Sequence, residues 1–174
     1  MQSLASFSAK RTKRSYILAV DSFRRDNRRL VFQFDTGASM SLVGLNTVCD
    51  DDEGKAILAR IILEEVAANG IEEEKEFAKT ATNEEVGVYP CRLSGVSIMN
   101  TKPRDLYFHV YLGDVNLPLL GFDFTDYCDY HHRINGDIEV TAISDYAGRD
   151  CYGERFIDFD VVLDKYYSEM PPYI

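Results

Sequence analysis

A short apolar segment that ends in an aspartate constrains this chain of 174 residues more than any other feature. Residues 30–34 are apolar and aromatic apart from one glutamine, a composition typical of a buried strand. The segment runs straight into a tight turn, in which a glycine lets the backbone bend and hydroxyl groups are available to a carboxylate. The turn consists of Asp35, Thr36, Gly37, Ala38 and Ser39. This pattern predicts a site that uses the Asp35 carboxylate.

A second apolar segment strengthens this interpretation. Residues 116–124 read as a strand, with Leu119 and Leu120 ending at Gly121, followed by a short helix. With both motifs present, residues 15–143 resemble the retropepsin-like aspartic proteases, the retroviral protease family and its cellular and bacterial relatives. The resemblance covers roughly three quarters of the chain, and its two motifs are specific when they occur together.

The resemblance implies a mainly β fold, a single-domain closed β-barrel of the retropepsin-like acid protease type. One inserted amphipathic helix is expected over about residues 51–69, because apolar side chains recur at helical spacing from Ile57 to Val66. A short helix is expected after Gly121. The inserted helix is interpreted as cover for one face of the sheet, with a role in substrate binding or dimer formation as the alternative.

Residues 77–89 look like the flap, the hairpin that folds over the substrate in this family. The residues expected to contact a bound peptide are Thr80, Ala81, Thr82 and Asn83. Viral flaps have glycines at the tip, whereas this chain has polar residues there, followed by Glu84 and Glu85. These two acids disfavour acidic substrates, and the lack of glycine makes closure of the flap harder.

The resemblance also assigns roles within the turn. Asp35 would be the catalytic carboxylate, Thr36 would bond the opposite loop, and Gly37 would donate its N–H to the carboxylate. Ala38 and Ser39 would support the loop, with Ser39 at the outer carboxylate oxygen. Two such carboxylates share one proton, so that one activates water while the other protonates the departing amine. From the residues alone, the alternative is that Asp35 merely ends a strand in an Asx-type turn.

The chain contains a single Asp-Thr-Gly and no internal repeat. A second carboxylate must therefore come from another copy, which predicts a homodimer that cleaves peptide or protein substrates without a cofactor. Two alternatives stay open. One is a non-catalytic dimeric module that binds peptides or acts as a scaffold; the other is a monomeric regulatory domain whose extra elements cap the dimer face.

The net charge of −10 is unevenly distributed. Residues 1–30 carry eight basic and two acidic side chains, which leaves −16 for the rest of the chain. An acidic body repels phosphates, so neither nucleic acid nor a membrane is an expected partner. The chain has no apolar run that reads as a signal peptide or a membrane span, and its four cysteines have no short paired spacing. A cytoplasmic location is the simplest expectation.

Three parts are expected along the chain: a flexible basic arm at 1–14, the protease domain at 15–145, and an extension at 146–174 that packs on the domain or the dimer interface. Within the extension, the alternation over 156–163 predicts a strand. Asp123 is expected to begin or line a surface helix.

Residues 126–132 combine cysteine, histidine and carboxylates, and therefore have to be considered as a metal site. Neighbouring residues on a strand point to opposite faces, so His131 and His132 would not both ligate one ion. A helix end that runs into a strand is the favoured interpretation, and no metal is expected.

Overall fold

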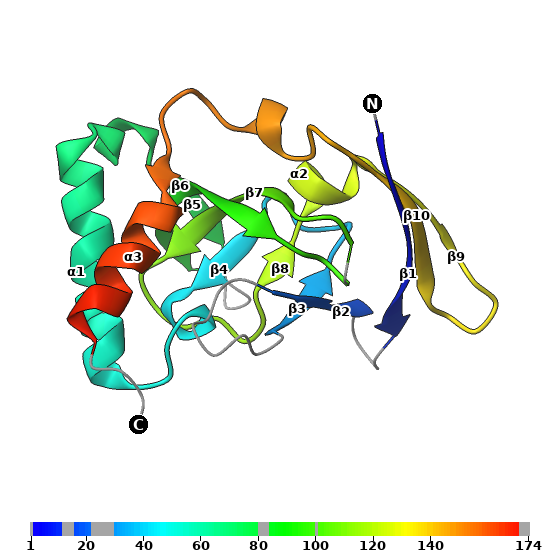
Figure 1. The fold of residues 1–174 in the computed structure, drawn as a ribbon, viewed down its shortest axis with the longest axis horizontal. Helices are drawn as coiled ribbons and strands as arrows, with labels where there is room; N and C mark the ends of the chain where they lie inside the picture. Colours follow the sequence, from blue (N-terminus) through cyan, green and yellow to red (C-terminus); the bar gives the residue numbers. More distant parts are fainter. Residues whose placement is uncertain (1, 12–15, 22–29, 80–83, 100, 171–174) are drawn as a thin grey trace.

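The computed structural model describes residues 2–11, 16–21, 30–79, 84–99 and 101–170. The strands are β1 (Gln2–Arg11), β2 (Tyr16–Val20), β3 (Leu30–Phe34), β4 (Leu42–Gly44), β5 (Glu76–Lys79), β6 (Glu85–Val96), β7 (Arg104–Tyr111), β8 (Leu119–Leu120), β9 (Cys128–His132), β10 (Ile138–Ser144) and β11 (Ile157–Asp158). The helices are α1 (Asp52–Ala68), α2 (Phe122–Thr125) and α3 (Phe159–Glu169), with 3-10 turns at Leu45–Thr47, Ile71–Glu74 and Arg149–Cys151. Figure 1 shows α1 and α3 at one end of the molecule, β1, β9 and β10 at the other, and the remaining strands between them.

The eleven strands form one sheet in the order β11-β6-β7-β4-β8-β3-β2-β1-β10-β9, with β5 paired to β6 beside this path. The pairs β3–β8, β4–β7 and β6–β11 are parallel, which brings segments that are distant in sequence side by side. The expected mainly β fold with few helices is confirmed. Among the described residues the path ends at β11 and β9 without a pairing between them, so closure into a barrel stays a prediction.

The expectation of a flexible arm at residues 1–14 is wrong for residues 2–11, which form β1. This strand pairs antiparallel with β10, from Gln2 opposite Ser144 to Ala9 opposite Ile138. The sequence carries a strand signal that the basic composition obscures, because apolar and polar residues alternate from position 5 to position 10. The partner strand β10 lies far along the chain, so no local pattern predicts the pairing.

Helix α1 agrees with the predicted helix over residues 51–69. The Asp51 carboxylate accepts the Gly54 N–H at 2.6 Å and caps its first turn. One face is buried and carries Leu58, Ile61, Ile62 and Val66. The short helix expected after Gly121 is also present, as α2.

The predicted strand over 156–163 is wrong beyond its first residues. Only Ile157 and Asp158 pair, parallel to β6, and the chain then turns into α3. The Asp158 carboxylate accepts the Asp160 N–H at 3.1 Å and so caps the helix. Its buried residues, Phe159, Val162, Leu163 and Tyr166, follow a helical spacing. The alternation over 156–163 is misleading because it spans β11 and only the first residues of α3.

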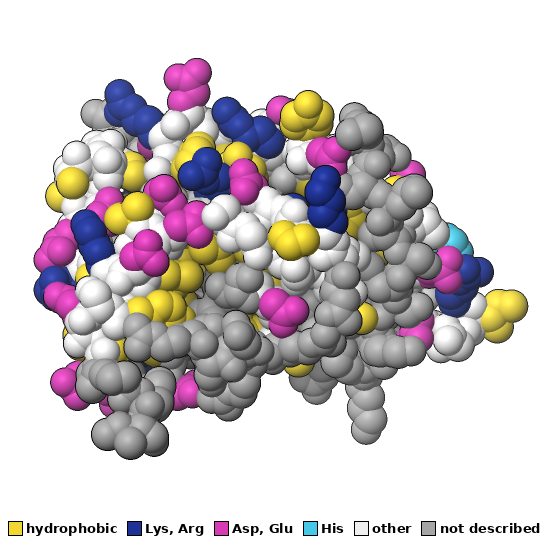
Figure 2. Space-filling view, in the orientation of Figure 1, with side chains coloured by type: hydrophobic (Ala, Val, Ile, Leu, Met, Phe, Trp, Pro, Cys, Tyr) yellow, Lys and Arg dark blue, Asp and Glu magenta, His cyan; other side chains and the backbone are white. Residues whose placement is uncertain are grey.

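Figure 2 shows acidic and basic side chains interspersed over the face in view, without one dominant patch of either sign. Between α1 and α3, Arg60 pairs with Glu169 and Lys165 pairs with Glu65. The Arg60–Glu169 pair is exposed on both sides, and Lys165 is exposed in the other pair, so each contributes little to stability individually. None of the described helices is long and apolar enough to cross a membrane.

The extension after residue 145 is part of the hydrophobic core. Phe159 is fully buried and meets the equally buried Phe108 of β7 edge to face, with ring centroids 5.3 Å apart. Such a pair combines a large buried apolar area with a favourable ring geometry. The sheet and the extension therefore share one core.

We predict that Phe159→Ala lowers the free energy of unfolding by about 3–5 kcal/mol, because it leaves a cavity beside Phe108. Urea unfolding followed by circular dichroism measures this loss. Val161→Ala, at a position of the same helix that is 36% exposed, is the control and should change stability by less than about 1 kcal/mol. A similarly small effect of Phe159→Ala would show that the extension does not belong to the core.

Candidate active site

Strand β3 carries Asp35 to the end of the sheet. Phe32 and Phe34 are buried, which fixes the face of the strand that turns toward the core. On the side of β8, the Gln33 N–H donates to the Pro118 carbonyl and the Asp35 N–H donates to the Leu120 carbonyl, both at 2.9 Å. Asp35 therefore leaves the strand with its backbone fixed against the second apolar motif.

The Asp35 carboxylate accepts hydrogen bonds from its own turn. The Gly37 N–H lies 2.9 Å from Oδ1, as the resemblance implies, and the Gln33 side-chain amide lies 3.4 Å from Oδ2. Ser39 is exposed and is not among the donors to this carboxylate in the described structure, so Gln33 takes the place expected for it. Thr36 and Gly37 are also exposed, while Asp35 and Ala38 are half-buried.

Gly121 packs against the backbone of the Asp35 turn. The Phe122 N–H donates to the Ala38 carbonyl at 2.8 Å. A Cβ atom on Gly121 would lie 2.5 Å from the Met40 carbonyl oxygen and 2.8 Å from that of Ala38, closer than such atoms approach. The structure thus brings the two sequence motifs together, and only glycine fits at this contact.

A buried polar network lies behind the turn, and the sequence did not predict it. Asp123 is only 3% exposed, which corrects the expectation that it lies on a surface helix. Its Oδ1 accepts the Ser41 hydroxyl at 2.6 Å, and its Oδ2 accepts the Ser41 N–H at 2.9 Å and the Tyr152 hydroxyl at 2.7 Å. The Ser41 hydroxyl oxygen in turn accepts the Gly121 N–H at 3.1 Å. A buried carboxylate with three donors is well satisfied.

His109 extends this network toward the flap. Its Nδ1 lies 3.1 Å from the Tyr152 hydroxyl, and its Nε2 lies 3.2 Å from a carboxylate oxygen of Glu76 in β5. The Tyr152 hydroxyl donates its proton to Asp123, so the hydroxyl oxygen accepts a hydrogen bond from His109 Nδ1–H. A neutral imidazole carries one proton, and Nε2 of His109 is therefore unprotonated. The contact with Glu76 becomes a hydrogen bond only when the ring is protonated.

At the place predicted for the flap, the described residues form β5 and β6, which pair from Glu76–Val88 to Lys79–Glu85; that this hairpin folds over a substrate stays a prediction. The four residues expected to contact substrate, Thr80, Ala81, Thr82 and Asn83, lie outside the described residues. Phe77 on β5 is 63% exposed, an unusual position for a large apolar side chain.

A groove separates the flap strand from the Asp35 turn. Its first part has a volume of about 420 Å³ and is lined by Gly37, Ala38, Ser39, Met40, Leu42, Phe77, Ala78, Lys79 and Leu119. The second part, about 470 Å³, shares Leu42 and Leu119 and reaches Tyr111 and Leu117. We call these two parts the flap groove. The flap groove is lined mainly by apolar side chains, as ligand-binding clefts are.

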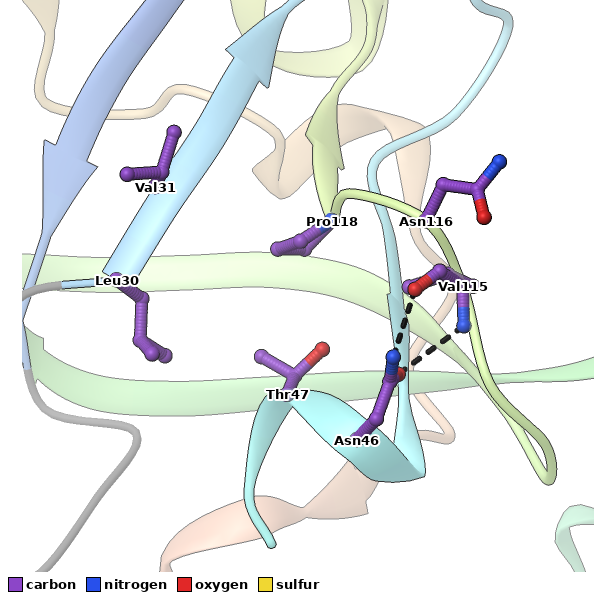
Figure 3. Close-up of a pocket in the computed structure, with 7 residues that line it drawn as sticks. All are labelled: Leu30, Val31, Asn46, Thr47, Val115, Asn116 and Pro118. Atoms are coloured by element: carbon purple, nitrogen blue, oxygen red, sulfur yellow. Dashed lines mark hydrogen bonds between the residues drawn. The ribbon is translucent and has the colours of Figure 1, made fainter. Parts of the chain in front are cut away.

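The loop that follows β7 forms the far wall of the flap groove. Figure 3 shows how Asn46 holds it: the side-chain amide donates to the Val115 carbonyl at 2.7 Å and accepts the Val115 N–H at 3.0 Å. Gly44 lies so close that a Cβ atom there would be 2.7 Å from the Gly113 carbonyl oxygen. The small hollow of about 100 Å³ beside Asn46 results from this packing, and no residue of the Asp35 turn lines it.

The remaining polar residues that the sequence singled out are accounted for by other contacts. Cys128, at the start of β9, donates to the Phe124 carbonyl, and His131 pairs with Glu139 at 3.8 Å. Within the described ranges, no three His, Cys, Asp or Glu side chains are placed to hold a metal ion. All four cysteines are free thiols, and burial raises the pKa of Cys128 to about 12, which makes it a poor nucleophile at neutral pH.

The structure is similar to the crystal structure of a retropepsin-like aspartic protease from Rickettsia conorii. The TM-score is 0.42 and the sequence identity 15%, over 83% of this chain and 97% of that chain. No protein-family model matches the sequence, and no curated protein matches it. At this level of identity and structural similarity, the function has to be inferred from the chain's own site.

We predict that His109 makes the stability of the fold depend on pH. Burial lowers its pKa from 6.5 to about 4, and Glu76 is 57% exposed, so water screens its opposing attraction. The unfolded chain therefore binds a proton first as the pH falls. The free energy of unfolding should decrease from about pH 6.5 to about pH 4 by at most about 3 kcal/mol.

Urea unfolding across this pH range measures the dependence. His109→Gln should flatten it, while His131→Gln, at a half-exposed position, should leave it as in the wild type. A dependence that persists unchanged in His109→Gln would contradict the assignment.

Proposed function

We propose that this protein is an aspartic endopeptidase that acts as a homodimer, with Asp35 of each chain forming a catalytic pair. The observation that carries the proposal is the Asp35 turn itself. Its carboxylate is held by the Gly37 N–H at the end of a buried strand, and the turn residues Gly37, Ala38 and Ser39 line a groove whose other side is formed by β5. This arrangement supplies a positioned carboxylate, a place for an extended peptide and an element that excludes water.

The second carboxylate is proposed to come from a partner copy. Thr36, Gly37 and Ser39 are exposed around the half-buried Asp35, which leaves this face of the turn available for another molecule. A symmetric pair places the same surface of both copies in contact and brings two identical turns together. Each copy contributes one flap groove, so a peptide would extend across both.

Two adjacent carboxylates cannot readily both ionise, and the pair therefore holds one shared proton. The ionised Asp35 takes a proton from a water molecule, whose oxygen attacks the peptide carbonyl carbon. The protonated Asp35 of the other copy hydrogen-bonds the carbonyl oxygen, and a proton passes to the amide nitrogen as the C–N bond breaks. The products are a carboxylic acid and an amine, and the pair regains its single proton.

We predict that Asp35→Asn lowers peptide hydrolysis by at least about a thousandfold and leaves the fold intact, because asparagine has nearly the same shape but does not cycle a proton. Incubation of both proteins with a random peptide library at acidic to neutral pH, followed by mass spectrometry, measures this loss. Asp126→Asn, at an exposed aspartate just after α2, is the control and should cleave like the wild type.

Equal cleavage by wild type and Asp35→Asn would place the activity elsewhere. Absence of cleavage by the wild type, with peptide binding retained, would favour the alternative that the chain is a non-catalytic dimeric module.

A further inference from the structure

A tyrosine from the C-terminal extension lies in the polar network behind the Asp35 turn. Tyr152 is 7% exposed, and its ring packs against His109 at a centroid distance of 4.8 Å and against Tyr107 at 5.6 Å. Its hydroxyl donates to Asp123 Oδ2 at 2.7 Å. Burial beside Asp123 raises the pKa of Tyr152 far above its ordinary value, so the hydroxyl keeps its proton and remains a donor.

Asp123 connects this hydroxyl to both sides of the Asp35 turn. On one side the carboxylate accepts the hydroxyl and the N–H of Ser41, two residues after the turn and directly before β4. On the other side the Ser41 hydroxyl accepts the Gly121 N–H, next to the bond from Phe122 N–H to the Ala38 carbonyl. The orientation of the Asp123 carboxylate therefore fixes the backbone on which Asp35 sits.

We propose that Tyr152 is a positioning residue for the Asp35 turn: by holding the Asp123 carboxylate, it keeps the turn in the geometry that catalysis requires. The inference rests on the proposed function for its catalytic consequence. The donor comes from the segment after residue 145, outside the part of the chain that resembles the protease family, so the extension contributes to the site as well as to the core.

What the Tyr152 hydroxyl contributes to holding Asp123 can be judged from the donors that would remain without it. Without it, Asp123 Oδ2 keeps only the Ser41 N–H, and the buried carboxylate has room to rotate away from Ser41. The rings of His109 and Tyr107 would still pack against phenylalanine at this position, so the fold should persist. The flap groove contains none of these side chains, and substrate binding should be unaffected.

We expect Tyr152→Phe to lower kcat roughly tenfold, with KM within about twofold of the wild type. Hydrogen exchange at the Ser41 and Gly121 amides should become at least about tenfold faster under conditions in which the protein stays folded. Tyr166→Phe is the matched control, because Tyr166 is equally buried but lies in α3, with its hydroxyl near Gly54. It should change neither kcat nor exchange at these two amides.

The exchange measurement separates this inference from the proposed function, because it needs no catalytic activity. If the wild type hydrolyses no peptide, faster exchange in Tyr152→Phe still supports the positioning role. Wild-type kcat and wild-type exchange in Tyr152→Phe, or equal changes in Tyr166→Phe, would overturn it. If Tyr152→Phe does not fold, Asp123→Asn tests the same hydrogen bond from the side of its acceptor. Faster exchange is then expected at the Ser41 amide, and unchanged exchange would overturn the inference.

Discussion

The close approach of Gly121 to the Asp35 turn is the contact on which the site depends. The backbone of Ala38 and Met40 leaves no space for a side chain at this point, and the Phe122 N–H bonds the turn from the same side. Strand β8 adds the bond from Asp35 N–H to the Leu120 carbonyl. A single aspartate on a short turn would otherwise move with the loop, whereas here one distant segment, residues 120–122, holds its backbone.

The buried network gives this contact a second layer of support. Ser41, Asp123 and Tyr152 come from three different parts of the chain, and each polar atom among them that points inward has a partner. Hydrogen bonds to a charged carboxylate are stronger than those between neutral groups, and burial strengthens them further. The His109 ring extends the same network to within 3.2 Å of Glu76 in β5, a contact that becomes a hydrogen bond only when the ring is protonated.

Local patterns predicted the parts of this structure that local interactions determine. The apolar segment before Asp35, the stripe of α1 and the glycine before α2 each lie within one element, and all three are present. Strand β1 is not evident from local sequence because its partner β10 lies far along the chain, and the start of α3 resembles a strand because its first residues alternate. No sequence spacing connects Asp123 with Tyr152; only the folded backbone brings them together.

Mixing wild-type and Asp35→Asn chains tests most directly whether two chains build one catalytic site. If each site needs a carboxylate from both copies, only wild-type pairs are active, and activity after complete subunit exchange follows the square of the wild-type fraction. An equal mixture should then retain about a quarter of the activity of wild type at the same total concentration. Activity that falls in simple proportion, to about half in the equal mixture, would mean that one chain suffices and would contradict the two-chain site.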